Sequence, residues 1–324
     1  MKFIILAGTL FLTAAYLPAQ YNVDSLRFLA QTLPDGLERL NTYKDLAFVH
    51  YGQNGELAGR YCDTIEMIAE RANLPKARSK AYYFRAAIAL VNGDSQAGIE
   101  YARTGLNILE PATSREDTTS ILNFLNLLGV CYENLGMYEE GMATYRQSGE
   151  MALATQDSVG YGIVLTNIGS TQLELLDKRE ARKTTQYSIA MLQATAEGRQ
   201  YLSNAYNNLA STYADSDSIL HFLALAEEWA LRAQDSLPLV NIYHNRAKPL
   251  VRKGRLREAL AADSMAIALA AEFGFAELYT IAHLGLGQTY DTLGLRDSAV
   301  HYIRRSIELG QEYGVITHLT DAYR

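Results

Sequence analysis

The sequence has 324 residues and a net charge of −7; 48% of its residues are hydrophobic, 20% are charged and only 6 are Pro. This composition suits long helices with few breakers and argues against disorder. The negative charge gives no attractive field for a phosphate backbone or for acidic lipid headgroups. We therefore expect neither nucleic acid nor a membrane surface as a partner of the folded region.

The first twenty residues, MKFIILAGTLFLTAAYLPAQ, carry one positive charge at Lys2, an apolar run from Phe3 to about Tyr16, and the small residue Ala19. This order is typical of a cleavable secretory signal. The apolar run is shorter than the roughly 20 residues that cross a bilayer. We expect a signal peptide over residues 1–19, cleavage after Ala19, and a mature protein on the periplasmic or extracellular side.

Helical periodicity then runs along the rest of the chain. Residues 20–39 are predicted to hold a capping helix, near Val23–Leu33, and residues 40–314 a repeat array of about seven hairpins, the first of them degenerate. First helices are expected near 79–92, 120–135, 160–176, 200–214, 240–253 and 279–293, each followed by a second helix. Residues 110–119 are predicted to form an exposed loop, and residues 315–324 to begin a further, truncated repeat.

The array is indicated by small residues at a period of about 40, one in each first helix: Ala86, Gly129, Gly169, Ala210, Ala247 and Gly287. A second small residue follows twelve positions later in most copies, at Gly98, Gly141, Ala181, Ala259 and Ala299. Two antiparallel helices that cross closely need such side chains where their backbones approach. The fixed offset therefore predicts helix hairpins.

A glycine seven residues after the first small residue marks the turn in four copies, at Gly93, Gly136, Gly254 and Gly294. The fourth repeat lacks this glycine and has Phe222 where the second small residue is expected. We predict an irregular hairpin there, around residues 216–218.

This pattern resembles the tetratricopeptide repeat, whose leucine, glycine, tyrosine, alanine and aromatic positions match Leu128, Gly129, Tyr132, Gly141 and Tyr145. Tyr290 and Tyr213 occupy the tyrosine position in other copies. The resemblance implies an all-α fold, a right-handed superhelical α-solenoid whose first helices line a concave groove. The period departs from the family's roughly 34 residues, which implies longer helices or connections.

The sequence shows no catalytic constellation. The six histidines include no pair at the i, i+4 spacing of a helical metal site, and the glycine-rich stretches lack the ending of a phosphate loop. Cys62 and Cys131 lie two repeats apart, too far for a disulfide. We expect no enzyme activity, no metal and no cofactor.

Polar residues recur two and three positions before the small residue, where the resemblance places the groove. Asparagine amides both donate and accept hydrogen bonds, as an extended peptide requires, and the repeats of kinesin light chain are a similar case. The alternative is that these amides bond to neighbouring first helices and fix repeat spacing. The candidate ligand-binding residues, with charged residues expected in the same groove, are Asn126, Asn167, Asn207, Asn208, His244, Asn245, Glu133, Asp215 and Lys248. Because Glu174 and Asp291 add to the acidic ones, the mixed groove suits a peptide with a basic segment.

The sequence therefore predicts an exported scaffold that binds a protein or peptide. Its export signal and unfinished last hairpin resemble the sensory ectodomains of bacterial membrane regulators, which implies a longer signalling protein with a membrane helix beyond residue 324. The alternative is a self-contained secreted or periplasmic scaffold that assembles envelope proteins.

Overall fold

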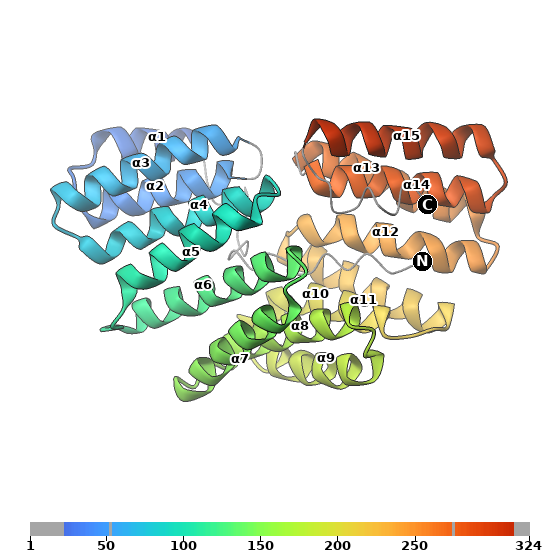
Figure 1. Ribbon diagram of the computed structural model, residues 1–324, viewed down its shortest axis with the longest axis horizontal. Coiled ribbons are helices and arrows are strands. Elements are labelled where there is room, and N and C mark those ends of the chain that lie inside the picture. Colours follow the sequence, from blue (N-terminus) through green and yellow to red (C-terminus); the bar gives the residue numbers. More distant parts are fainter. Residues whose placement is uncertain (1–22, 52–53, 274–275, 314–324) are drawn as a thin grey trace. The chain divides into compact units, whose positions relative to one another are not determined.

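A computed structural model describes residues 23–51, 54–273 and 276–313 (Figure 1). The predicted signal peptide and the predicted truncated repeat lie outside the described residues. The described chain is all helical and falls into two compact units, an N-terminal unit of residues 23–151 and a C-terminal unit of residues 152–313. Each unit is a run of antiparallel helix hairpins.

In the N-terminal unit the helix α1 precedes the hairpins α2/α3, α4/α5 and α6/α7, with a short 3-10 helix, η1, before α4. The bounds are α1 Val23–Thr32, α2 Leu37–His50, α3 Gly55–Arg71, η1 Pro75–Arg78, α4 Ser79–Val91, α5 Ser95–Leu109, α6 Arg115–Asn134 and α7 Tyr138–Ala154.

The C-terminal unit holds the hairpins α8/α9, α10/α11, α12/α13 and α14/α15, and α10 is preceded by the 3-10 helix η2. The bounds are α8 Ser158–Glu174, α9 Lys178–Gln193, η2 Gly198–Tyr201, α10 Leu202–Ser211, α11 Ser216–Ala233, α12 Leu237–Arg252, α13 Leu256–Phe273, α14 Ala276–Thr292 and α15 Arg296–Glu312.

The small residues twelve apart lie where the two helices of a hairpin cross. A Cβ added at Gly141 would lie 3.2 Å from the Gly129 carbonyl oxygen, and one at Gly129 would overlap the Tyr145 ring. A Cβ at Gly287 would likewise lie 3.3 Å from the Ala299 carbonyl oxygen. The predicted register is confirmed, and the alanines at equivalent positions are buried: Ala86, Ala181, Ala210, Ala247, Ala259 and Ala299.

Most hairpin turns close through a residue in the left-handed conformation. At Gly136, φ is +73°, and the following Met137 N–H donates to the Tyr132 carbonyl at 2.9 Å. Gly93, Gly254 and Gly294 adopt the same conformation, as a helix that ends in this way prefers. In the α8–α9 turn the position is filled by Leu176, with φ of +62°.

The turn between α10 and α11 is the irregular one, and it contains no residue with positive φ. Its carbonyl groups are instead capped by arginines from both neighbouring hairpins. Arg182 Nη2 on α9 donates to the Thr212 carbonyl at 2.7 Å, and Arg252 Nη1 on α12 donates to the Ala214 carbonyl at 3.5 Å. Phe222 stacks on Tyr213 with ring centroids 5.0 Å apart, which accounts for the missing small residue.

The loop predicted over residues 110–119 is wrong in its second half, because α6 begins at Arg115. Ser114 caps this helix by accepting from the Asp117 N–H at 3.0 Å. Lys76 of η1 holds the remaining loop: its Nζ donates to Pro111 O at 2.8 Å and to Asp117 Oδ2 at 2.6 Å.

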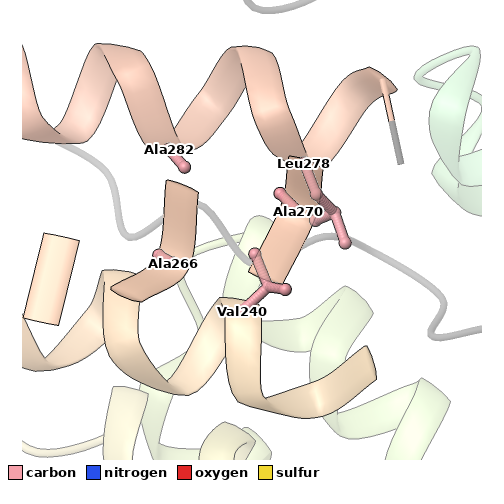
Figure 2. Close-up of a cluster of buried hydrophobic side chains, with 5 residues drawn as sticks. All are labelled: Val240, Ala266, Ala270, Leu278 and Ala282. Atoms are coloured by element: carbon pink, nitrogen blue, oxygen red, sulfur yellow. The ribbon is translucent and has the colours of Figure 1, made fainter. Parts of the chain in front are cut away.

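Alanines let successive helices of the C-terminal unit pack closely. Figure 2 shows Val240 of α12 against Ala266 and Ala270 of α13, with Leu278 and Ala282 of α14 on the other side. All five are buried. A larger side chain at either α13 position would overpack this three-helix contact.

Both cysteines are buried free thiols, and burial raises the pKa of Cys62 and of Cys131 to about 12. Such thiols stay protonated and act as small core residues. No helix within the described ranges is long and apolar enough to cross a membrane.

Candidate functional site

The candidate site is the surface formed by the first helices of the C-terminal unit, α8, α10, α12 and α14. We call it the first-helix face and define it by the positions six, three and two before, and one after, the small residue of each helix. At 100° per residue these positions share one side of an α-helix. In α8, α10 and α12 they carry mostly amides and hydroxyls, with one imidazole and one ammonium group, whereas in α14 they include Ile281, Leu284 and Gly285.

Hydrogen bonds between neighbouring first helices run across this face. Asn208 Nδ2 of α10 donates to the Thr166 carbonyl oxygen of α8 at 3.2 Å. Asn245 Nδ2 of α12 donates to Asn207 Oδ1 of α10 at 3.1 Å. All three asparagines are buried, so these bonds fix the distance between successive first helices.

The contact between α12 and α14 at the same level involves His244 and Gly285. A Cβ added at Gly285 would lie 2.5 Å from His244 Nδ1 and 3.5 Å from Asp263 Oδ1, so only glycine leaves room for both groups. Asp263 of α13 is buried and accepts a hydrogen bond from the Thr289 hydroxyl at 2.6 Å. Burial raises the pKa of Asp263 to about 7, although the Thr289 bond opposes the shift.

Two of the predicted asparagines have an unused polar atom. Asn167 of α8 is 2% exposed, and its Nδ2 has no hydrogen-bond partner within the described residues. In the N-terminal unit the buried Asn126 has an unpartnered Oδ1. Each is a buried group that a bound water or a ligand atom would stabilise.

The predicted charged residues do not gather at one place. Glu133 is buried inside the α6/α7 hairpin, where its Oε2 accepts from the Tyr145 hydroxyl at 3.0 Å. Asp215 is exposed at the N-terminus of α11 and caps it by accepting from the Ser218 N–H at 2.7 Å. Both carboxylates therefore have structural roles.

Lys248 lies on the first-helix face and is half-buried. Burial, together with the neighbouring Arg252 and Lys178, lowers its pKa. Lys248 therefore interacts electrostatically with Arg252 and Lys178.

The tyrosines of the repeat pack within their own units. Tyr132 is buried, and its hydroxyl accepts a hydrogen bond from Arg103 Nη2 at 2.7 Å. Tyr290 stacks on Tyr302 with centroids 5.4 Å apart. Both tyrosines pack between neighbouring helices, as the repeat pattern predicts.

Sequence reasoning missed four residues of this region: Asn204, Asn241, Gly285 and Asp263. Asn204 and Asn241 stand six residues before Ala210 and Ala247, so the same small-residue frame identifies them. Gly285 is signalled by the Gly-Leu-Gly run inside a helix. Asp263 has no sequence signal, because its burial depends on α14. Within the described chain no group of three or more His, Cys, Asp or Glu could hold a metal ion.

Comparison with known proteins supports the helical-repeat fold. The tetratricopeptide repeat family model matches residues 122–153 and 281–312. A search of the curated proteins finds no match. Solved structures similar to the chain include a Rap protein complexed with competence and sporulation factor, at 15% identity and a TM-score of 0.71, covering 90% of this chain and 80% of that one.

Two further structures share the fold. NprR in complex with its cognate peptide NprX is 13% identical with a TM-score of 0.63, covering 93% of this chain and 88% of that one. Aspartyl phosphate phosphatase F from Bacillus subtilis is 13% identical with a TM-score of 0.62, covering 90% and 76%. The chain is an all-α solenoid of antiparallel helix hairpins with a tetratricopeptide-repeat-like fold.

Proposed function

We propose that the chain is an exported scaffold that binds an extended protein or peptide segment on the first-helix face of its C-terminal unit. The observation that carries this proposal is the recurrence of side-chain amides at fixed positions of α8, α10 and α12. An amide supplies both donors and an acceptor, which is what the main chain of an extended peptide needs.

The fold supports the same proposal. NprR, a protein of this fold, is solved with its cognate peptide, and a Rap protein is solved with competence and sporulation factor. Helical solenoids present long surfaces on which an extended segment can lie. By this likeness the ligand is a protein or peptide.

We propose binding as the whole activity, without catalysis. The sequence offers no nucleophile with an adjacent base, and the largest pKa shift on the first-helix side belongs to Asp263, which is buried behind it. Since one protein of this fold is an aspartyl phosphate phosphatase, the purified chain should be assayed against a protein that carries an aspartyl phosphate. Dephosphorylation above the spontaneous rate would contradict the proposal.

We propose export because residues 1–19 have the order of charged, apolar and small residues that is typical of a secretory signal. We further propose that the chain is the sensory region of a longer signalling protein. Mass spectrometry of the protein expressed in a bacterium with an outer membrane should find Gln20 at its N-terminus in the periplasmic fraction. A cytoplasmic protein that keeps residues 1–19 would overturn this part.

Selection from a displayed library of random 12-residue peptides tests the binding itself. We expect the chain from residue 20 to enrich peptides that bind in calorimetry with one site per chain. The double variant Asn167→Ala, Asn208→Ala should bind the selected peptide more weakly than the wild type does. An unchanged affinity would show that these two amides do not contribute to peptide binding, and no enrichment at all would reject peptide binding.

A further inference from the structure

A cavity opens on the N-terminal unit where α3 ends and η1 begins. Its volume is about 520 Å³, which lies within the roughly 300–1,000 Å³ of sites that bind small molecules. The lining comes from the last turns of α3, from the residues that connect α3 to η1, and from η1 itself. The cavity therefore uses no residue of the first-helix face.

The way in which α3 ends shapes this cavity. Asn73 follows the helix with φ of +53°, a left-handed conformation that asparagine tolerates better than most residues. The Leu74 N–H donates to the Ala69 carbonyl at 2.7 Å and closes the end of the helix. Pro75 then begins η1. Because proline cannot continue the hydrogen-bonding pattern of α3, the chain turns away and leaves a hollow beside the last turns of the helix.

Part of the lining is apolar. Ala69 is fully buried, Leu74 is half-buried, and Met67 is 41% exposed. A methionine side chain is flexible and polarisable, so it adapts to apolar groups of different shape. The cavity can therefore cover an aliphatic or aromatic group.

Two carboxylates of α3 line the cavity, and only one of them is neutralised. Glu66 Oε2 lies 2.5 Å from Arg85 Nη1, and Glu66 Oε1 lies 3.5 Å from Arg78 Nη2. Glu70, one helical turn further on, is exposed and makes no hydrogen bond or ion pair within the described residues. Glu70 is therefore an acceptor for a cationic group.

The cavity also offers a guanidinium group with unused donors. The Arg78 side chain is 46% exposed, and its one ion pair, to Glu66, is at the limit of hydrogen-bond distance. Its other N–H groups can bind a carboxylate through two parallel hydrogen bonds. Because Glu66 and Glu70 are neighbours on one side of α3, roughly 6 Å apart, the Arg78 guanidinium lies about one helical turn from the Glu70 carboxylate.

This combination selects a ligand with two opposite charges and an apolar part. A simple organic cation would be repelled by Arg78, and a simple organic anion by Glu70. An α-amino acid carries its ammonium and carboxylate groups on one carbon, next to its side chain. A peptide carries the same two charges at opposite ends, so it cannot bring both to one small cavity in this way.

We propose that the cavity binds a free α-amino acid with an apolar side chain. The ammonium group contacts Glu70, the carboxylate contacts Arg78, and the side chain lies against Met67 and Leu74. This site is separate from the proposed peptide-binding surface, and neither proposal depends on the other.

Calorimetry of the chain from residue 20 with L-leucine, L-isoleucine, L-methionine and L-phenylalanine, one at a time, tests the ligand. At least one should bind at one site per chain with a Kd below about 1 mM. Its amide, which lacks the carboxylate, and its N-acetyl derivative, which lacks the ammonium group, should each bind about tenfold more weakly or worse. No binding by any of the four, or derivatives that bind as well as the parent, overturns the proposal.

Two variants test the assigned contacts. Glu70→Gln and Arg78→Gln should each bind the parent amino acid about tenfold more weakly, with a thermal midpoint close to that of the wild type. Glu70→Gln should bind the N-acetyl derivative as the wild type does, and Arg78→Gln should do so with the amide, because in each case the lost partner is already missing from the ligand. Glu100→Gln and Arg115→Gln, exposed residues of α5 and α6, are the controls and should bind the parent with unchanged affinity. Full affinity for the parent in either cavity variant would contradict the assignment.

Discussion

Both units are built from antiparallel helix hairpins, but the side chains buried in those hairpins differ. In the N-terminal unit the last hairpin, α6/α7, buries aromatic and aliphatic groups such as Phe124, Leu128 and Tyr145, and a polar network around Lys76 holds the loop that precedes it. In the C-terminal unit, hydroxyls, amides and a carboxyl are buried between helices. Apolar packing makes a rigid hairpin, whereas polar bonds between first helices also set a spacing, and a binding surface depends on that spacing.

The largest effect is expected from breaking the apolar hairpin. Gly129→Leu forces a side chain into the Tyr145 ring and should lower the free energy of unfolding by about 3 kcal/mol. Gly59→Ala in α3 is the control, since a Cβ there meets nothing within 4 Å, and it should stabilise slightly. Urea unfolding of both variants measures the difference. Equal stabilities would show that the hairpin register is wrong.

The next effect comes from the buried carboxyl of the C-terminal unit. Because burial raises the folded pKa of Asp263 to about 7, above an unfolded value near 4, its contribution is largest below pH 4 and is lost as pH rises to 7. Asp263→Asn should remove that loss and stabilise the protein at pH 8 by about 1–3 kcal/mol.

Unfolding measured at several pH values between 4 and 8 gives the slope of stability against pH for the wild type and for Asp263→Asn. Asp291→Asn, which removes an exposed carboxylate from α14, is the control. A variant that keeps the wild-type slope would mean that Asp263 is ionised throughout.

The N-terminal unit should respond to acid in the opposite direction. The Lys76 ammonium, followed by the Thr113 N–H, holds the pKa of Asp117 well below its ordinary value. Its contribution is therefore present above pH 4 and is lost as pH falls further. Asp117→Asn should cost about 1–2 kcal/mol at pH 7 and clearly less at pH 2. The same loss at both pH values would contradict the role of charge.

The irregular turn between α10 and α11 has no left-handed glycine, and a mutation there tests whether polar contacts stabilise it instead. Arg182→Ala should destabilise the protein by about 1 kcal/mol, because the Thr212 carbonyl loses its guanidinium donor. Arg179→Ala, an exposed neighbour on α9, should have little effect. Hydrogen exchange should show faster opening of α10 in the first variant alone; no change there would mean that the turn closes without Arg182.

The smallest expected effect is an increase in stability. Leu176 holds a left-handed conformation while its side chain is 68% exposed, so Leu176→Gly relieves backbone strain and loses little burial. We expect up to about 1 kcal/mol of added stability by thermal unfolding. A loss would indicate that Leu176 packs in solution.

Much of the fold could be predicted from the sequence, because a small residue is required wherever two helix backbones meet, and Gly129 with Gly141 shows this directly. The turn at Leu176 and the start of α6 at Arg115 could not, because the first lacks a glycine and the second follows a polar cluster typical of loops. The division into two units lies inside the continuous helix α7, where no break in the pattern marks it.

The site could be predicted only in part. The small-residue frame placed the asparagines on one side of the first helices, but it could not show which amides bond to a neighbouring helix. Asn208 and Asn204 have the same chemistry, and only their burial and partners distinguish them. Gly285 and Asp263 belong to the site through packing between three helices, which no local pattern encodes.

Hydrogen–deuterium exchange of the chain from residue 20, with and without a library-selected peptide, tests the central claim most directly. If the first-helix face of the C-terminal unit is the binding surface, the peptide should slow exchange in α10 and α12 more than in the second helices α9, α11 and α13. Slowed exchange confined to the second helices, or to the N-terminal unit, would contradict the account.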